Sequence, residues 1–129
     1  MPGTLTQART VLAVPRLDRS VAFYREVMGL ALDWQEAGWA LLSRDGFELM
    51  LGECPDALPA RDIGDHAYVA YLVVESVDAL FAEFSARGVD VIKPLASEAW
   101  DMREFGIQTL DGHRLMFGEP CGEGDAAPG

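Results

Sequence analysis

The chain has 129 residues, half of them hydrophobic, which is enough for one compact domain or two small modules that share a core. Its 21 acidic and 10 basic residues give a formal net charge of −11, which disfavours nucleic acid and anionic membranes as partners. No run of about 18 apolar residues is present, and the N-terminus lacks the charged-then-apolar order of a signal peptide. We therefore expect a cytoplasmic protein with an acidic surface, which suits solubility and would also favour a cationic ligand.

The first half of the chain predicts a strand, a helix and then three strands. Asp18 or Ser20 is the expected N-cap of the helix, and Gly29 is typical of the residue that follows a helix. After a lead-in over residues 1–8, the expected elements are a strand over 10–15, a helix over 21–28 and strands over 30–36, 39–44 and 45–53.

The second half predicts the same order. Ser76 is the expected cap of its helix, Gly88 ends that helix, and Pro94 stops the strand that follows. The expected elements are a strand over 68–75, a helix over 77–87 and strands over 89–93, 100–110 and 111–119. Two cysteines, Cys54 and Cys121, form no C-x-x-C motif, and we expect reduced thiols rather than a disulfide.

One phrase occurs in both halves and indicates an internal duplication. D-G-F-E-L-M-L-G-E at 45–53 returns as D-G-H-R-L-M-F-G-E at 111–119, with six of nine residues identical. Each copy predicts a tight turn at Asp-Gly, a half-buried strand and a break at the second glycine. The predicted organisation is a first module over 9–53, a linker over 54–67, a second module over 68–120 and a flexible tail over 121–129.

Several stretches carry a resemblance to a known family. V-P-R-L-D-R-S-V-A-F-Y-R-E-V-M-G-L at 14–30 resembles the first strand-helix unit of the vicinal oxygen chelate superfamily, which holds glyoxalases, extradiol dioxygenases, fosfomycin-resistance enzymes and bleomycin-resistance proteins. Segments 73–84, 100–105 and 111–117 agree with it, and 36–51 looks most like the bleomycin-resistance proteins. The resemblance implies an α+β fold of two βαβββ modules, whose sheets curl into half-barrels with the helices on the convex side. It also implies a homodimer and a ligand on the concave face.

The resemblance also locates the metal ligands of the family's enzymes, which are His and Glu on four strands. Two lie five residues before the valine that closes each first strand, and two lie four residues after the glycine of each Asp-Gly turn. The corresponding residues here are Arg9, Val69, Met50 and Met116, none of which ligates a hard divalent metal.

Other potential ligands do not restore such a site. His66 and His113 are expected in solvated turns, and Glu48 and Glu119 are carboxylates without an evident partner. We therefore expect neither a metal nor another cofactor. The sequence also contains no nucleophile elbow, phosphate-binding loop or dinucleotide-binding glycine pattern.

Period-two alternation assigns the strand residues to two faces. The residues expected to face the helices are Leu12, Val14, Leu49, Leu51, Leu72, Val74, Leu115 and Phe117. The concave face and its walls provide the expected ligand contacts, which are Arg9, Trp34, Trp39, Glu48, Met50, Val69, Tyr71, Trp100, Phe105, Arg114 and Met116. Phe105 has an alternative placement on the helix side, and aromatic or methionine side chains on a sheet also serve as core or dimer contacts.

Three functions follow as hypotheses. The first is a metal-free homodimeric protein that sequesters a small aromatic or cationic molecule of the antibiotic type. The second is a glyoxalase-like or dioxygenase-like enzyme with a displaced or absent metal site. The third is a structural or partner-binding module whose cleft is filled by its own side chains.

Overall fold

The computed structural model describes residues 3–62 and 68–121 and contains two modules with the same element order. The first comprises β1 (Thr10–Val14), α1 (Leu17–Glu26), β2 (Ala31–Glu36), β3 (Trp39–Arg44) and β4 (Phe47–Glu53). A short 3₁₀ helix, η1 (Ala60–Asp62), follows. The second comprises β5 (Tyr68–Val73), α2 (Val77–Ala86), β6 (Asp90–Ser97), β7 (Met102–Gln108) and β8 (Arg114–Pro120).

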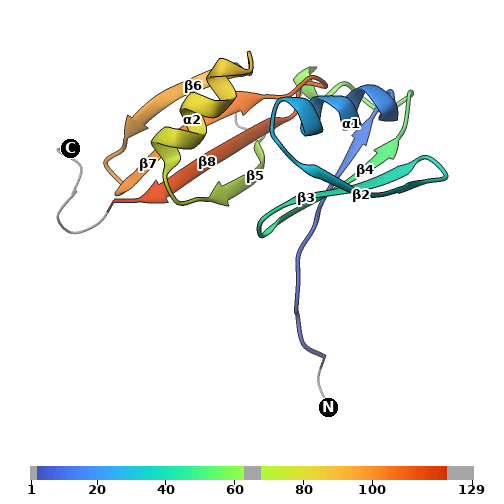
Figure 1. Cartoon of the computed structure of the whole chain (residues 1–129), viewed down its shortest axis with the longest axis horizontal. Coiled ribbons are helices and arrows are strands. Elements are labelled where there is room, and N and C mark those ends of the chain that lie inside the picture. The colour runs from blue at the N-terminus through green and yellow to red at the C-terminus, as the bar shows by residue number, and fades with distance from the viewer. Residues whose placement is uncertain (1–2, 63–67, 122–129) are drawn as a thin grey trace.

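Each module forms a four-stranded mixed sheet that does not close into a barrel. The strand orders are β1-β4-β3-β2 and β5-β8-β7-β6, so the two sheets have the same topology. The first strand of each module pairs in parallel with the last, and the other pairs are antiparallel. Figure 1 shows α1 and α2 on the same side of the molecule, each above its own sheet. The predicted α+β fold of two βαβββ modules is confirmed. Within residues 3–62 and 68–121, no helix is long and apolar enough to cross a membrane.

The helices cover a core that both modules share. Leu12, Val14, Leu49, Leu51, Leu115 and Phe117 are buried, as the alternation predicted. Burial of apolar side chains on one face of each sheet is the main stabilising contribution to such a fold, at about 25 cal/mol per Å². Within the described part of the chain, neither α1 nor α2 covers the opposite face of its sheet (Figure 1). We call these two helix-free surfaces the open faces.

The glutamate at the end of each repeated phrase caps the helix of its own module. Glu53 Oε2 accepts a hydrogen bond from the Leu17 amide at 2.9 Å. Glu119 accepts from the amides of Ser76 at 2.9 Å and Val77 at 3.0 Å. These bonds satisfy amides at the first turn that have no partner within the helix, and a carboxylate there interacts favourably with the helix dipole. The N-cap residues themselves make no side-chain cap bond, so the last strand of each module replaces the cap.

Several element boundaries differ from the prediction. α1 begins at Leu17 instead of residue 21, because Glu53 and not Asp18 or Ser20 caps it. β6 continues through Pro94 to Ser97, with a register shift between Lys93 and Ala96, because an edge strand tolerates proline.

The two Asp-Gly turns also differ from each other. In the first turn Asp45 has the positive φ of 52°, and in the second Gly112 has a φ of 86°. Gly52 and Gly118 were expected to end their strands, but they lie inside β4 and β8.

The second turn packs beneath α1 and joins the modules on one side. Ser20 on α1 donates a hydrogen bond to Asp111, and Thr109 Oγ1 accepts from the His113 amide at 3.1 Å. His113 was expected in a solvated turn but is buried, and burial lowers the pKa of its imidazole. His66 lies outside the described residues.

An ion-pair network joins the modules on the other side. Arg44 at the end of β3 forms a bidentate pair with Glu83 on α2, at 2.8 and 2.9 Å. The same guanidinium donates to the Met28 carbonyl at 2.8 Å, and its carbon lies 5.9 Å from the Phe84 ring centroid. Arg87 adds a second pair with Glu83 at 3.0 Å. The hydrogen bonds from Arg44 hold the pKa of the Glu83 carboxyl below its usual range.

Replacing Glu83 by glutamine should lower the free energy of unfolding at pH 7 by about 1 kcal/mol. Because the pKa of Glu83 is lowered in the folded state, its contribution is present above the unfolded value of about 4.3 and is lost as the pH falls through the folded value. Urea unfolding at pH 7 and pH 3 should therefore show a gap between wild type and E83Q that shrinks in acid. Glu26→Gln, on an exposed α1 residue without a partner among the described residues, is the matched control. A gap of equal size at both pH values would contradict this account.

Candidate functional site

Exposed aromatic and aliphatic side chains cover much of both open faces. Val11 opposes Met50 on the first sheet, and Trp34 opposes Leu41, so these side chains share a face. The large apolar side chains exposed on these faces are Val11, Trp34, Trp39, Val69, Tyr71 and Val73. Val73 is 69% exposed. Apolar surface of this extent is typical of a binding surface for a ligand or a second protein chain.

Glycine makes room for two of these rings. Trp39 pairs with Gly52 across β3 and β4, and a Cβ at Gly52 would lie 2.8 Å from the indole. Tyr71 lies over Gly118, where a Cβ would come within 2.7 Å of the ring carbon Cζ. Because glycine has no side chain, each ring can lie against the backbone of the neighbouring strand. The repeated phrase therefore places one aromatic ring on the open face of each sheet.

A buried carboxylate connects three side chains on the second open face. Glu104 lies opposite Gly118 in the β7–β8 ladder and is 3% exposed. Its Oε1 accepts hydrogen bonds from Tyr71 Oη and Trp100 Nε1, both at 2.9 Å. Lys93 Nζ lies 3.5 Å from Oε2 and 2.9 Å from the Glu98 carboxylate. Partial burial and the hydrogen bond to Glu104 raise the pKa of the Tyr71 phenol.

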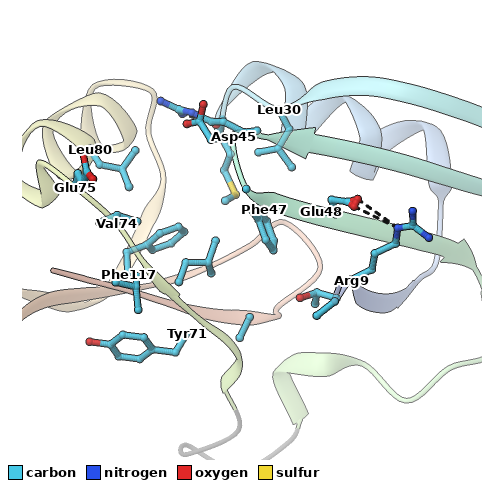
Figure 2. Close-up of a pocket in the computed structure, with 18 of the residues that line it drawn as sticks. Arg9, Leu30, Asp45, Phe47, Glu48, Tyr71, Val74, Glu75, Leu80 and Phe117 are labelled. Carbon is cyan, nitrogen blue, oxygen red and sulfur yellow. Dashed lines mark hydrogen bonds and ion pairs between the residues drawn. The ribbon is translucent and has the colours of Figure 1, made fainter. Parts of the chain in front are cut away.

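A cavity of about 690 Å³ lies between the modules. Its volume is within the range of sites for small organic ligands. Figure 2 shows the ion pair of Arg9 and Glu48 at one end, with Phe47 beside it and Tyr71, Val74 and Phe117 across from it. The lining includes apolar side chains from both modules, namely Met28, Leu30, Leu72, Leu80 and Phe84. Leu72 and Val74, which were assigned to the helix side, are half-buried, pack against the core and also line this cavity.

A sequence model of the Glyoxalase/Bleomycin resistance protein/Dioxygenase superfamily matches residues 6–117. The chain belongs to this superfamily. Similar solved structures include TioX from Micromonospora sp. ML1, with 24% identity and a TM-score of 0.75 over 89% of this chain and 98% of that one. The bleomycin-binding protein of Streptomyces verticillus has 21% identity and a TM-score of 0.72, over 90% and 97%. Lactoylglutathione lyase from Agrobacterium tumefaciens has 19% identity and a TM-score of 0.69, over 92% and 96%. At these identities the likeness shows only the fold. Superfamily members that are named as binding proteins and members that are named as enzymes share this fold.

The four residues that the resemblance assigns to the metal positions of the superfamily's enzymes lie in different surroundings. Val69 is exposed, Met50 and Met116 are half-buried, and Arg9 pairs with Glu48 at 3.4 Å. Guanidinium, isopropyl and thioether groups do not form an oxygen-and-imidazole site. Among the residues that the structure describes, no three His, Cys, Asp or Glu side chains gather in a way that would hold a metal ion. Of the two acids considered as ligands, Glu48 pairs with Arg9 and Glu119 caps α2.

The structure places the predicted contact residues in several different surroundings. Arg9, Glu48 and Tyr71 line the cavity between the modules. The open faces and their margins carry Trp34, Trp39, Met50, Val69, Tyr71, Trp100 and Met116, of which Trp100 lies in the turn before β7 and not on a strand. Arg114 is largely buried at the start of β8.

Phe105 does not belong to the open face. Its side chain is 0% exposed and stacks on Phe117 at 5.1 Å, with Phe81 and Phe84 edge-on. β7 alternates, so the neighbouring Glu104 points to the open face and Phe105 points to the helices. The alternative placement on the helix side is the correct one.

Glu104 and Lys93 were not predicted as site residues. A detectable signal was present, because Glu104 immediately precedes the uncharged run Phe105–Ile107. A charged residue next to a fully buried strand segment must find partners on the other face. Its partners come from β5, β6 and the turn before β7, and local spacing does not identify them.

Proposed function

We propose that this superfamily member is a metal-free binding protein that sequesters a small aromatic or cationic molecule of the antibiotic type. One observation carries the proposal: the open faces present exposed aromatic rings. The residues that the sequence assigns to the superfamily's metal positions, Arg9, Met50, Val69 and Met116, support it, because none of them is a ligand for a hard metal. Sequestration needs no bond-making step, because a bound molecule is removed from solution by mass action alone. The likeness to a bleomycin-binding protein supports this class of ligand.

The aromatic rings support a planar ligand. Trp34, Trp39 and Trp100 expose their indoles, and a ring that stacks on one of them gains about 0.5–1.5 kcal/mol beyond the burial of its area. Half-buried Met50 and Met116 suit an irregular ligand outline, because a thioether side chain adapts its shape. The net charge of −11 favours a cationic ligand over an anionic one.

A second copy of the chain forms part of this proposal. Isolated open faces with exposed Val11, Val73 and Trp100 are costly in water, and a homodimer in which two copies face each other would cover them and enclose the ligand. Two free thiols, at Cys54 and Cys121, are in keeping with a reducing cytoplasm. Multi-angle light scattering of purified protein at micromolar concentration should give twice the monomer mass of 14.1 kDa.

Titration of the intrinsic tryptophan fluorescence with a panel of planar aromatic and cationic antibiotics tests the proposal. We expect saturable quenching by at least one member at micromolar concentration. Trp100→Ala should weaken the binding of that member about tenfold, because it removes a stacking surface. Leu58→Ala, at an exposed residue outside the open faces and the cavity, is the matched control and should bind as wild type does.

Two results would contradict the proposal. The first is the absence of quenching by every member of the panel. The second is stoichiometric Zn, Mn, Ni or Fe in metal-replete purified protein, which would favour an enzyme with a displaced metal site.

A further inference from the structure

Two exposed aromatic side chains on the second open face, Tyr71 and Trp100, donate hydrogen bonds to the buried carboxylate of Glu104. We propose that Glu104 is a positioning residue, which holds the rings of Tyr71 and Trp100 in place as one wall of the ligand site. The claim that these rings contact a ligand rests on the proposed function. The ring positions themselves follow from contacts within the chain.

The hydrogen bonds converge on one oxygen. Glu104 Oε1 accepts from the Tyr71 hydroxyl and from the Trp100 indole N–H at the same distance of 2.9 Å. Trp100 is 60% exposed and precedes β7 in a turn, so packing alone does not fix its ring. A charge-assisted hydrogen bond to a carboxylate that is itself buried gives the indole a fixed anchor. Tyr71 is anchored in the same way from β5, so one carboxylate sets two rings from different parts of the module.

The second carboxylate oxygen is held as well. Lys93 Nζ lies 3.5 Å from Glu104 Oε2 and 2.9 Å from Glu98 Oε1. Two carboxylates share one ammonium group, so the cluster of Lys93, Glu98 and Glu104 has a net charge of −1. The bulge between Lys93 and Ala96 lies directly beside Glu104, which pairs with Ala96 in the ladder. A buried carboxylate with partners on both oxygens has little freedom to rotate.

The backbone under the rings is shaped for the same arrangement. Gly118 lies under Tyr71, and Gly106 on β7 lies under Tyr68. Glu104 stands opposite Gly118, so its carboxylate reaches the phenol without an intervening side chain. Rings that are fixed before a ligand arrives lose less conformational entropy on binding. Glu104 therefore contributes to affinity without being required to touch the ligand.

The first test uses the wild-type protein without a ligand. We expect the three tryptophan indole N–H groups to give three signals in a protein labelled with ¹⁵N-tryptophan, and Trp100→Phe would assign one of them. Trp100 is more exposed than Trp34 and Trp39, but within the described residues it is the one whose indole N–H has a hydrogen-bond partner. We expect the Trp100 indole proton to exchange with solvent at least tenfold more slowly than the other two. Exchange as fast as theirs would overturn the inference.

The second test compares two charge-neutralising variants of the same cluster. Glu104→Gln should move the Trp100 indole signal and speed the exchange of its proton. In a Trp34→Phe/Trp39→Phe background it should also lower the fluorescence anisotropy of Trp100, because the ring rotates more freely. Glu98→Gln is the matched control, because it removes the same charge beside Lys93, while Glu98 accepts a hydrogen bond from neither ring. An unchanged Trp100 signal in E104Q, or an equal change in E98Q, would overturn the inference.

Ligand titration then separates this inference from the proposed function. With the panel member that quenches wild type, E104Q should bind three- to tenfold more weakly and E98Q within twofold of wild type. Wild-type affinity in E104Q, with a mobile Trp100 ring, would show that the anchor is irrelevant to binding. If no panel member binds the wild type, the proposed function fails, while the exchange measurement still decides whether Glu104 holds the rings.

Discussion

Phe105→Ala should lower the free energy of unfolding by about 3–5 kcal/mol, the largest effect we expect from any single side chain. Phe105 has no exposed surface and contacts three other rings, of which Phe117 is stacked on it at 5.1 Å. Removing the ring leaves a cavity at the centre of the aromatic cluster, and the rigid strands around it close that cavity only in part. Urea unfolding followed by circular dichroism measures the loss.

Two further variants show that the effect belongs to the core. Phe105→Leu keeps an apolar group of moderate size and should cost clearly less than the alanine variant. Trp100→Ala removes a larger ring from a residue that is 60% exposed, and should change the free energy of unfolding by about 1 kcal/mol or less. If F105A instead weakened ligand binding while leaving stability unchanged, the placement of Phe105 in the core would be wrong.

Gly118→Ala should disturb both stability and the open face. A Cβ at this position would lie 2.7 Å from Tyr71 Cζ and 3.0 Å from Cε1, so the phenol must leave its place. The hydrogen bond from Tyr71 to Glu104 is then lost, and the buried carboxylate retains fewer donors. We expect a loss of about 2 kcal/mol in the free energy of unfolding and a weakening of ligand binding by about tenfold. Unfolding in urea and the fluorescence titration measure the two effects.

Gly46→Ala is the matched control for this substitution. A Cβ at Gly46 meets no heavy atom within 4 Å, and the φ angle there is not in the left-handed region. We expect its stability to stay within about 0.5 kcal/mol of wild type. Equal behaviour of G118A and G46A would mean that Tyr71 shifts without cost, and the close packing of ring on glycine would then have no energetic consequence.

The sequence predicts the fold because its signals are local. Alternation in β1, β4 and β8 places Leu12, Leu49 and Leu115 in the core, since a strand turns every second side chain to the same face. The repeated phrase indicates two copies of one unit, and glycines after both helices mark where they end. These features depend on neighbours within a few residues.

Features that depend on distant residues were not predictable from local patterns. The start of α1 was misplaced because Glu53, far along the chain, provides its cap. Phe105 and Trp100 were assigned to the same wall, but Trp100 lies in the turn before β7 and Phe105 faces the helices. The anchor on Glu104 was missed because Tyr71 and Lys93 reach it from other strands.

The two capping glutamates determine when each helix can be capped during synthesis of the chain. Leu17 and Glu53 are 36 residues apart, and Val77 and Glu119 are 42 apart, so each cap bond spans nearly a whole module. A ribosome releases the chain from its N-terminus, and the carboxylate that caps α1 therefore emerges only after β2, β3 and β4 have been synthesised. Until then the first turn of the nascent helix has water as the partner for its amides. The last residue of the repeated phrase thus couples completion of each sheet to completion of the helix that covers it.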